Sequence, residues 1–315
     1  LQEAADPGRR ALIRAAGLDG KTLTAGRVGF ILAPRLNAAG RIGHALRGVD
    51  LLTTTSEGEA NRIARDLEEM NRKRQEMDRR IQDEALRKVD ALDLDRTYGI
   101  VLADAGWHAG VIGIVASRVV EQTGRPTVLV ALEGEQGKGS GRSIAGFDLH
   151  SALGECSDLL VRYGGHKAAA GVTIEAAKVD AFARRFAEVA NARLTPDDLV
   201  PELRVDMEVA IDDVNDDLEA LLRHFEPFGI GNPSPVLLAR GVRMAAAPRI
   251  VGKDGLRLRL QTARGELDAL GWAMAPRLVE LHGAPVLDIA FRLERDEYQG
   301  VSRLQARIAD FHVTS

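Results

Sequence analysis

Apolar residues after Ser56 recur at spacings of three and four, which is the period of a helix that packs along one face. Ser56 and Glu59 have the spacing of a capping box, a signal that starts helices. We therefore predict a single helix of about 32 residues within residues 56–94, which would be about 50 Å long. Arg74 interrupts the apolar stripe of this helix, and the other charged residues, Asp78 among them, are expected to face solvent.

The segment before this helix, residues 1–55, has a weaker pattern. A short apolar run over Val28–Leu32 predicts a strand, and the mixed proline, glycine and polar residues of Ala33–Arg41 predict a loop after it. Residues 95–194, after the helix, alternate β-branched apolar runs with amphipathic runs. This strand–helix–strand order favours an α/β domain with a partly parallel sheet.

The pattern changes again after Thr195–Asp198, a short polar segment that is typical of a linker. Residues 199–315 hold short apolar runs separated by turns such as Lys253–Gly255. This spacing predicts an all-β barrel or sandwich. The fold class that we predict is therefore α/β plus all-β.

The composition is that of a soluble globular protein, because 45% of the 315 residues are apolar and 28% are charged. Cys156 is the single cysteine, which excludes an internal disulfide and a cysteine-rich metal site. No apolar run is long enough to cross a membrane and no signal peptide is visible, so we expect a cytoplasmic protein. The chain begins with Leu1 rather than methionine, so we also expect a missing upstream segment.

The net charge of −4 argues weakly against a nucleic-acid partner, but it hides a local excess of cations. Residues 240–264 include seven lysines or arginines and one aspartate. Arg257 and Arg259 alternate with leucines there, which predicts a strand with its arginines facing outward. With Arg249 and Lys253 they are predicted to form a cationic strip, the DNA track, whereas an ordinary soluble strand face is the alternative. Aromatic residues make up only 4% of the chain, so a platform of many stacking rings is not expected.

The block Gly139–Ser143 has the composition of a phosphate grip. Glycines leave backbone N–H groups unshielded, the hydroxyls of Ser140 and Ser143 can donate hydrogen bonds, and Arg142 adds a planar fork that suits phosphate. The alternative is a tight turn with one surface arginine.

A second block places His166 directly after Gly164 and Gly165. Two glycines before a histidine suggest a ring held close to a crowded backbone. Such a histidine can bond a phosphate, orient a water molecule or bind a metal. The alternative is a loop histidine that is bonded to a carbonyl group.

A third block, Gly106–Gly110, follows a predicted strand and opens a predicted helix. Helix N-termini offer free N–H groups and a partial positive charge, so His108 is placed to face an anionic ligand there. Trp107 is expected to serve as a hydrophobic lid, and Asp104 is expected to cap the helix.

Together these blocks resemble the RecJ family, the single-strand-specific 5′→3′ exonucleases of the DHH phosphoesterase superfamily. Ala33–Gly43 is similar to a block near the end of the family's catalytic domain. The three glycine-rich blocks resemble its DHH-associated domain, whereas Phe225–Pro233 and Glu297–Gly300 resemble signatures of its C-terminal OB fold. The resemblance runs over essentially the whole chain.

The resemblance implies a domain organisation. Residues 1–55 would be the C-terminal remnant of a DHH catalytic domain, and residues 56–94 a long connecting helix. Residues 95–194 would form the DHH-associated substrate-binding domain, and residues 199–315 an OB-fold barrel that binds nucleic acid.

The resemblance also implies roles for single residues. His166 would support catalysis, and Arg35 and Asn37 would approach the active site from the catalytic lobe. The residues implied to bind the substrate or its phosphates are Arg35, Asn37, His108, Ser140, Arg142, Ser143, Gly164 and Gly165. In the β-domain, the DNA track would extend the path of the strand.

The family's Asp-His-His motif, whose residues hold Mn²⁺ or Mg²⁺, would lie upstream of Leu1. This chain has no carboxylates and histidines at metal-ligand spacing, so we expect no metal site in it and DNA binding without cutting. The whole protein would be a hydrolase that cuts phosphodiester bonds in DNA repair and recombination. The implied partners are single-stranded DNA, a single-strand-binding protein and a RecQ-type helicase, and a monomer is expected.

Three alternatives remain open. One is a free-standing module that binds single strands without any activity, and another is a small-nucleotide phosphodiesterase of the same superfamily. A third is a tRNA-linked module. The β-domain and the Arg35 block favour the RecJ resemblance, and an Asp-His-His motif upstream would decide between an enzyme and a module.

Overall fold

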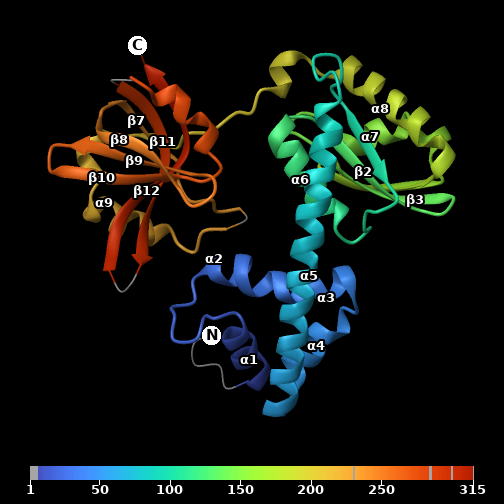
Figure 1. Cartoon of the computed structure of the whole chain (residues 1–315), viewed down its shortest axis with the longest axis horizontal. Coiled ribbons are helices and arrows are strands. Elements are labelled where there is room, and N and C mark those ends of the chain that lie inside the picture. The colour runs from blue at the N-terminus through green and yellow to red at the C-terminus, as the bar shows by residue number, and fades with distance from the viewer. Residues whose placement is uncertain (1–5, 230, 284–285, 299–300, 315) are drawn as a thin grey trace. The chain divides into compact units, whose positions relative to one another are not determined.

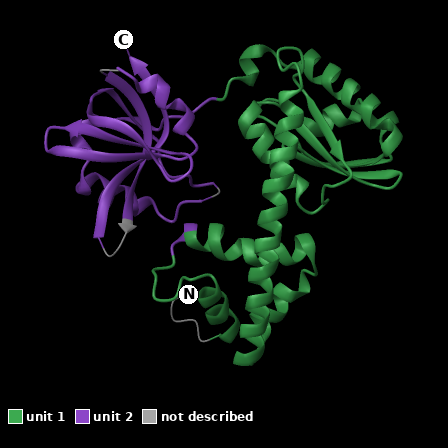
Figure 2. Cartoon of the chain, in the orientation of Figure 1, with its two compact units in different colours: residues 1–23, 27–201 green, residues 24–26, 202–315 purple. Residues whose placement is uncertain are grey.

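The computed structural model describes residues 6–229, 231–283, 286–298 and 301–314. The chain forms two compact units, of which unit 1 comprises residues 1–23 and 27–201, and unit 2 comprises residues 24–26 and 202–315 (Figures 1 and 2). Leu1, Ile230 and Gln299–Gly300, which entered the sequence predictions, lie outside the described residues. No helix among the described residues is long and apolar enough to cross a membrane.

The N-terminal part of the chain, which belongs to unit 1 except for residues 24–26, is helical. Its elements are α1 (Pro7–Ala15), α2 (Ala25–Arg27), a π-helical turn η1 (Val28–Leu32), α3 (Ala33–Ile42) and α4 (Leu46–Thr53). The predicted strand at Val28–Leu32 and the predicted loop at Ala33–Arg41 are therefore wrong. A five-residue apolar run is too short for its period to separate a strand from a helix. Pro34 sits in the first turn of α3, where its missing N–H removes no helical bond.

Helix α5 (Glu57–Asp90) is the long helix that the periodicity predicts, although it ends at Asp90 rather than at residue 94. The Ser56 hydroxyl accepts the N–H of Glu59 at 3.3 Å and caps the helix. The helix packs against α1, α3 and α4, and further along against α6 (Ile112–Thr123). Asp78 does not face solvent as predicted: its side chain is 3% exposed, because it points toward arginines on α5 and α6.

The second part of unit 1 is built on a sheet that has five strands within the described residues, in the order β1-β2-β3-β5-β4. Only β1 and β2 run parallel, so the predicted partly parallel sheet is confirmed. The strands are β1 (Ile100–Asp104), β2 (Thr127–Glu133), β3 (Gln136–Arg142), β4 (Arg162–Gly165) and β5 (Ala169–Glu175).

Helices cover both faces of this sheet. Helices α5 and α6 pack on one face, and α7 (Leu149–Gly154) and α8 (Val179–Arg193) pack on the other. Strand β2 serves both cores, because Leu129 points toward α6 while Val128 and Val130 point toward α8. Three short 3₁₀ turns complete the unit, namely η2 (Ser157–Leu159), η3 (Ala176–Lys178) and η4 (Pro196–Leu199).

Unit 2 consists mainly of strands, as predicted. Its described residues form a sheet with the strand order β6-β7-β11-β12-β10-β9-β8. The elements are β6 (Met207–Glu208), η5 (Ile211–Asp213), α9 (Asp216–Leu222), η6 (Arg223–Phe225), β7 (Leu237–Val242), β8 (Met244–Val251), β9 (Gly255–Thr262), β10 (Gly265–Gly271), η7 (Ala275–Leu281), β11 (Val286–Tyr298) and β12 (Val301–Thr314).

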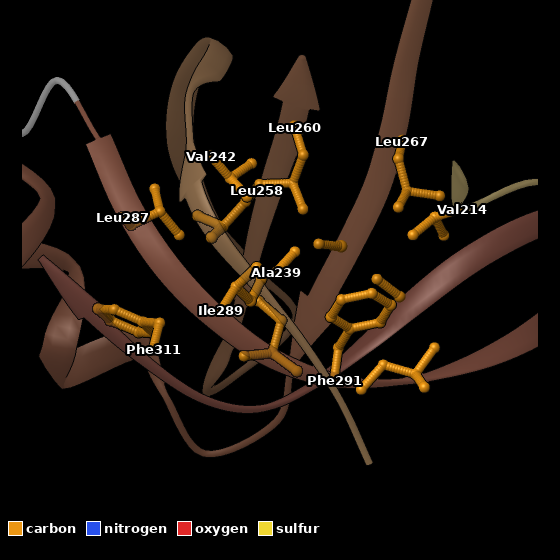
Figure 3. Packing of buried hydrophobic residues seen from close by; sticks show 14 of the residues in the cluster. Val214, Ala239, Val242, Leu258, Leu260, Leu267, Leu287, Ile289, Phe291 and Phe311 are labelled. Atoms are coloured by element: carbon orange, nitrogen blue, oxygen red, sulfur yellow. The ribbon is translucent and has the colours of Figure 1, made fainter. Parts of the chain in front are cut away.

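One hydrophobic core fills unit 2. Figure 3 shows Leu258 and Leu260 of β9 pointing into it, together with Ile289 and Phe291 of β11. The alternation of leucine and arginine along β9 therefore places the leucines inside, as predicted.

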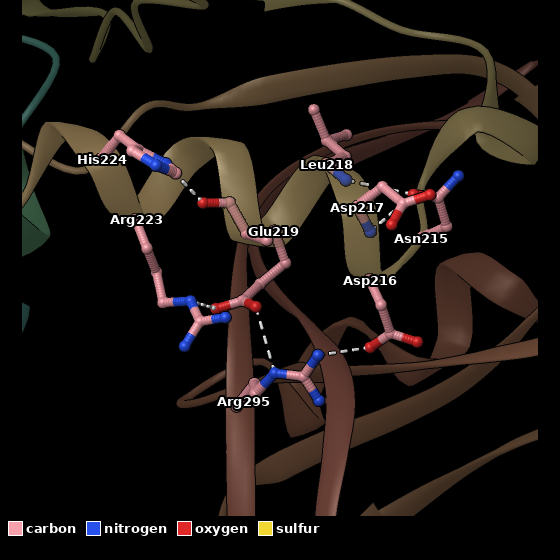
Figure 4. A network of polar contacts seen from close by, with 9 residues as sticks. Asn215, Asp216, Asp217, Leu218, Glu219, Arg223, His224 and Arg295 are labelled. Atoms are coloured by element: carbon pink, nitrogen blue, oxygen red, sulfur yellow. Dashed lines mark hydrogen bonds and ion pairs between the residues drawn. The ribbon is translucent and has the colours of Figure 1, made fainter.

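A buried ion pair attaches α9 to β11. Glu219 of α9 is buried, and its carboxylate accepts from Nε of Arg295 at 3.0 Å and lies 3.1 Å from Nε of Arg223 (Figure 4). Arg295 also pairs with Asp216 in the first turn of the helix, which Asn215 caps. Two guanidinium groups thus compensate the one buried carboxylate.

Candidate functional site

Arg142 and His166 lie at the same end of the sheet in unit 1. Arg142, the last residue of β3, is paired in register with Ala169 of β5. His166, just after β4, donates its N–H to the carbonyl oxygen of Ala169 at 2.9 Å. Residues opposite one another on neighbouring strands point to the same face, so the Arg142 and His166 side chains leave the sheet on one face.

Ser140 and Arg142 project from this face against the first turn of α6. A Cβ atom at Gly113 would lie 2.9 Å from Ser140 Oγ and 3.0 Å from Arg142 Nη2. Arg142 Nη1 donates to Ser140 Oγ at 3.1 Å, which leaves the serine proton free to donate. The N–H of Gly113 has no acceptor among the described residues. A hydroxyl, a guanidinium group and a helix N-terminal amide therefore converge, and this combination suits an anion.

The glycines of β3 have a different role from the predicted one. Strand β3 is paired with β2 on one side and β5 on the other, so its amides belong to the sheet and the prediction that they are unshielded is wrong. Gly139 and Gly141 point toward the opposite face. A Cβ atom at Gly139 would lie 2.4 Å from Val172 Cγ2, and one at Gly141 would lie 2.9 Å from Leu149 Cδ2. These glycines make room for the core.

Ser143 also differs from its predicted role. Its hydroxyl donates to the carbonyl oxygen of Phe147 at 2.7 Å, and its N–H donates to that of Ala168 at 3.0 Å. The serine thus fixes the loop after β3, and its hydroxyl proton is already used.

Gly164 and Gly165 lie on β4, which in the described part of the chain has β5 as its one neighbour. Gly165 has a φ angle of 146°, and a Cβ atom there would lie 2.4 Å from the carbonyl oxygen of Ala169. Because hydrogen bonds alternate along an antiparallel pair, the N–H of His166 points toward β5 and that of Gly165 points away from it. Gly165 can therefore supply the open amide that β3 cannot.

His108 lies in the loop before α6. Its Nδ1 accepts the N–H of Gly110 at 3.1 Å, so the neutral ring carries its proton on Nε2. The exposed ring lines a hollow of about 620 Å³ together with Trp107 and Lys138. This hollow is at the start of β3, whereas Arg142 is at the end of that strand, so the structure separates His108 from Arg142 along β3.

The two residues beside His108 are engaged with α5. Trp107 is 5% exposed, and its Nε1 donates to Glu84 at 2.9 Å, so it is a core residue. Asp104 accepts the N–H of Gly106 at 2.8 Å and pairs with Lys88, so the prediction that it caps α6 is wrong. The hydrogen bond from Gly106 is the main reason that the pKa of Asp104 lies below its ordinary value.

Four arginines and one aspartate, which we call the arginine cluster, form a chain of charged neighbours that leads from α5 and α6 through Arg41 to Arg142. Asp78 lies 3.0 Å from Arg118 of α6 and 3.5 Å from Arg74 of α5. Arg41 of α3 lies near both Arg74 and Arg142, and its Nη1 donates to the carbonyl oxygen of Gly110 at 3.4 Å. Within the described chain, the cluster thus sets four guanidinium groups against one carboxylate.

The pKa values of two arginines in this cluster are lowered, as expected where arginines are buried and positive charge is in excess. Burial lowers the pKa of the Arg142 guanidinium, and Arg41 lowers it further. Burial also lowers the pKa of Arg74, and the positive charges of Arg41 and Arg118 lower it further. The negative charge of Asp78 raises it. An anion bound at the Ser140–Arg142 face would relieve the repulsion among the arginines.

Sequence reasoning missed Lys138, Arg41, Arg74 and Arg118 as site residues. Lys138, Ser140 and Arg142 alternate with glycines along β3, and this period of two signals one common face. The interruption of an apolar stripe by Arg74 was a second signal, because a buried arginine needs a partner. The contacts of Arg41 and Arg118 join elements far apart in sequence and had no local signal.

Arg35 and Asn37 were predicted to bind substrate from the helical lobe. Arg35 is only 13% exposed, pairs with Glu68 and donates to the carbonyl oxygen of Ile31 at 2.6 Å. Asn37 is exposed and lines a separate hollow of about 290 Å³ together with Leu36 and Val49. The polar atoms of Arg35 thus serve the packing of α3 on α5.

The predicted DNA track in unit 2 is less positive than the local sequence suggests. Arg257 donates two bonds to Asp268, at 3.1 and 2.5 Å, and Arg259 pairs with Glu266 at 3.2 Å. Both carboxylates come from β10, beyond the stretch whose charges predicted the strip. Arg249 and Lys253 are exposed and, within the described residues, have no carboxylate at ion-pair distance.

The described residues do not form a site for Mn²⁺ or Mg²⁺. No three histidine, cysteine, aspartate or glutamate residues gather there in a way that could hold a metal ion.

Comparison with known proteins agrees with the architecture. Residues 96–192 match the family model of the DHHA1 domain, and residues 205–310 match that of the RecJ OB domain. The chain is 37% identical over 268 residues to the single-stranded-DNA-specific exonuclease RecJ of Bacillus subtilis, covering 84% of this chain and 34% of that protein. It is 34% identical over 309 residues to RecJ of Escherichia coli, covering 95% and 53%.

A solved structure agrees as well. The crystal structure of RecJ in complex with Mg²⁺ from Thermus thermophilus superimposes with a TM-score of 0.82 at 33% identity, over 99% of this chain and 47% of that one. The fold and the two matches define a protein with a DHHA1 domain followed by an OB domain. The chain belongs to the RecJ family and corresponds to the C-terminal portion of its members. It spans between about a third and a half of the length of these relatives.

Proposed function

We propose that this chain is the substrate-binding part of a RecJ-type single-stranded-DNA exonuclease and that it binds the phosphates of a DNA strand on the Ser140–Arg142 face. The observation that carries the proposal is the arginine cluster, in which Asp78 is the one carboxylate set against four guanidinium groups among the described residues and Arg142 lies close to Gly113. A partly buried excess of guanidinium groups favours a polyanion, and Arg142 has the planar fork that binds phosphate in two places.

Five of the predicted site residues have a proposed task. Arg142, Ser140 and the amide of Gly113 bind one phosphate, and the open amide of Gly165 beside His166 binds at the end of the same sheet. His166 is exposed there and supports catalysis by orienting a phosphate or a water molecule. His108, with its proton on Nε2, donates to a more distant part of the strand.

The remaining predictions extend the proposal. Residues 1–55 would end a catalytic domain, residues 56–94 connect it to the DHHA1 domain, and residues 199–315 extend the DNA path. Arg249 and Lys253 carry the DNA track, whereas Arg257 and Arg259 contribute less because carboxylates already hold them. The metal, Mn²⁺ or Mg²⁺, would be held by residues outside this chain, and solved RecJ structures contain both ions.

We further propose that the 315-residue chain binds DNA without cutting it. As in the sequence predictions, we expect a cytoplasmic monomer in DNA repair and recombination, with a single-strand-binding protein and a RecQ-type helicase as partners. The match to a RecJ OB domain supports a strand as the substrate over a small nucleotide, which would not need a second unit.

Two measurements test the proposal. Fluorescence anisotropy with a labelled, 5′-phosphorylated single strand should show binding that weakens steeply with salt and that Arg142→Ala reduces about tenfold or more. Incubation of the same strand with the chain and Mn²⁺ should release no nucleotides. An affinity that changes neither with salt concentration nor with Arg142→Ala would contradict the phosphate site. Progressive release of nucleotides would contradict the proposal that the chain does not cut DNA.

A further inference from the structure

Three strands of unit 2 end together near an exposed tryptophan. In register, Ile250 of β8 lies opposite Leu256 of β9, which lies opposite Gly271 of β10. Trp272 directly follows Gly271 and therefore comes level with Gly255, the residue before Leu256. The outward face of β8 and β9 thus ends at an indole ring.

The indole of Trp272 rests on the backbone of a glycine. A Cβ atom at Gly255 would lie 3.4 Å from Trp272 Cε3 and 3.0 Å from Val251 Cγ2. Gly255 itself is buried, whereas Trp272 is 53% exposed. The ring is therefore in contact with the chain on the side of Gly255, and about half of the residue is open to solvent.

The backbone turn after Trp272 is fixed by its surroundings. Ala273 has a φ angle of 58°, in the left-handed region that non-glycine residues adopt only when the surroundings impose it. Two residues later, Ala275 donates its N–H to the carbonyl oxygen of Asp254 at 3.0 Å. This bond ties the turn after β10 to the turn between β8 and β9.

Two cations lie on the same outward face as Trp272 or in the turn next to it. Arg249 of β8 is paired with Arg257 of β9, two residues before the pair of Val251 and Gly255, and these positions share the outward face. Lys253 lies in the turn that joins the two strands. Neither Arg249 nor Lys253 has a carboxylate at ion-pair distance in the described chain, although Arg257 does.

The other tryptophan of the chain shows the contrast. Trp107 is buried and its indole N–H donates to Glu84. For Trp272, no acceptor meets the indole N–H within the residues that the structure describes. A large apolar ring open to solvent on the same face as two cations offers a flat contact surface for an anionic ligand.

We propose that Trp272 is a base-stacking site for single-stranded DNA, in which one unpaired base lies on the exposed surface of the indole while Arg249 and Lys253 bind the flanking phosphates. A base offers a flat apolar surface of the right size, and its backbone supplies the charge that the cations lack. The bases of a duplex are already stacked, so this site selects unpaired strands. The inference rests on the proposed function, because it requires that the chain binds a DNA strand.

The test uses the fluorescence of Trp272. Trp107 and Trp272 are the two tryptophans of the sequence, so the emission of the Trp107→Phe chain comes from Trp272 alone. Subtracting the emission of Trp272→Phe from that of wild type gives the Trp272 signal in a chain that keeps Trp107. The probes are a single-stranded oligonucleotide of mixed sequence and an abasic oligonucleotide of equal length. The mixed strand should quench Trp272, whereas the abasic strand should bind without quenching it.

Affinity provides the second readout. Trp272→Ala should weaken binding of the mixed strand about tenfold and leave binding of the abasic strand unchanged. Phe225→Ala is the matched control, because Phe225 is another exposed aromatic residue of unit 2, at 65%, and its replacement should change neither affinity.

The outcomes separate the two proposals. Binding of the mixed strand without quenching, or equal losses for both strands in Trp272→Ala, overturns stacking and leaves the phosphate site standing. Failure of either strand to bind contradicts the proposed function as well. Trp272 emission that shifts with protein concentration in the absence of DNA would assign the ring to contact between copies of the chain and overturn the inference.

Discussion

Asp78 of α5 lies 3.0 Å from Arg118 of α6, and its carboxylate is almost completely closed to solvent. The same carboxylate lies 3.5 Å from the buried Arg74, while its Oδ1 atom has no hydrogen-bond donor among the described residues. One acidic group thus joins the long helix to the helix whose N-terminus faces the candidate site. The arrangement balances part of the positive charge of the arginine cluster and leaves the rest for a ligand.

Asp78→Ala should therefore destabilise unit 1 by about 3 kcal/mol, because Arg74 would remain buried without its carboxylate. The free energy of unfolding from urea denaturation measures this loss. Glu76→Ala is the control, since Glu76 is exposed on the same helix, and it should change stability by no more than about 0.5 kcal/mol. Equal effects of the two changes would show that Asp78 does not hold α5 to α6.

The long helix could be predicted from sequence because all of its signals are local. Its apolar period and the cap at Ser56 depend on residues within a few positions of one another. The burial of Asp78 could not be predicted in this way, because its partner Arg118 lies 40 residues further along. Arg257 is an intermediate case, since its pairing with Asp268 follows from the register of one hairpin.

The candidate site was predicted by composition rather than by geometry. Gly139 and Gly165 both stand in glycine-rich runs of the sequence, but their roles differ. Gly139 makes room for the side chain of Val172, whereas Gly165 adopts a positive φ angle on the edge strand β4. Sequence cannot separate these roles, because glycine allows both a close side chain and a close ligand. The position of Arg142 at the same end of the sheet as His166 depends on the pairing of both strands with β5, which is a tertiary property.

Gly139→Ala should destabilise the chain by about 1 to 3 kcal/mol, because the added methyl group overlaps Val172 in the core. Gly164→Ala should cost less than about 0.5 kcal/mol, since nothing lies within 4 Å of a Cβ atom there. Thermal and urea denaturation of both variants check the contrast. If Gly139→Ala were as stable as Gly164→Ala, the packing role of the β3 glycines would be wrong.

Cys156 should make stability fall at alkaline pH. Burial raises the pKa of its thiol to about 11, whereas an unfolded thiol ionises near about 8.5. The unfolded chain therefore loses its proton first, and stability that is present below the ordinary thiol pKa decreases as the pH rises toward the folded pKa.

The comparison of wild type with Cys156→Ala isolates this effect of the thiol. The stability difference between the two chains should shift against wild type by about 2 kcal/mol between pH 7 and pH 10. Urea denaturation at both pH values gives the number. A thiol reagent should also react with Cys156 only as fast as the chain opens, and rapid reaction with the folded chain would contradict its burial.

Arg249 and Arg257 stand opposite each other on β8 and β9, yet they should differ in their effect on DNA binding. Arg257 is held by Asp268, so a phosphate must compete with that carboxylate, whereas Arg249 has no such partner among the described residues. Arg249→Ala should therefore reduce the slope of log affinity against log salt concentration by about 0.7 for a single strand. Arg257→Ala should reduce it less, and anisotropy titrations over a series of salt concentrations measure both slopes. If the slope for Arg249→Ala equalled that of wild type, or if Arg257→Ala reduced the slope more than Arg249→Ala, the DNA strand would bind the arginines that are paired with carboxylates instead.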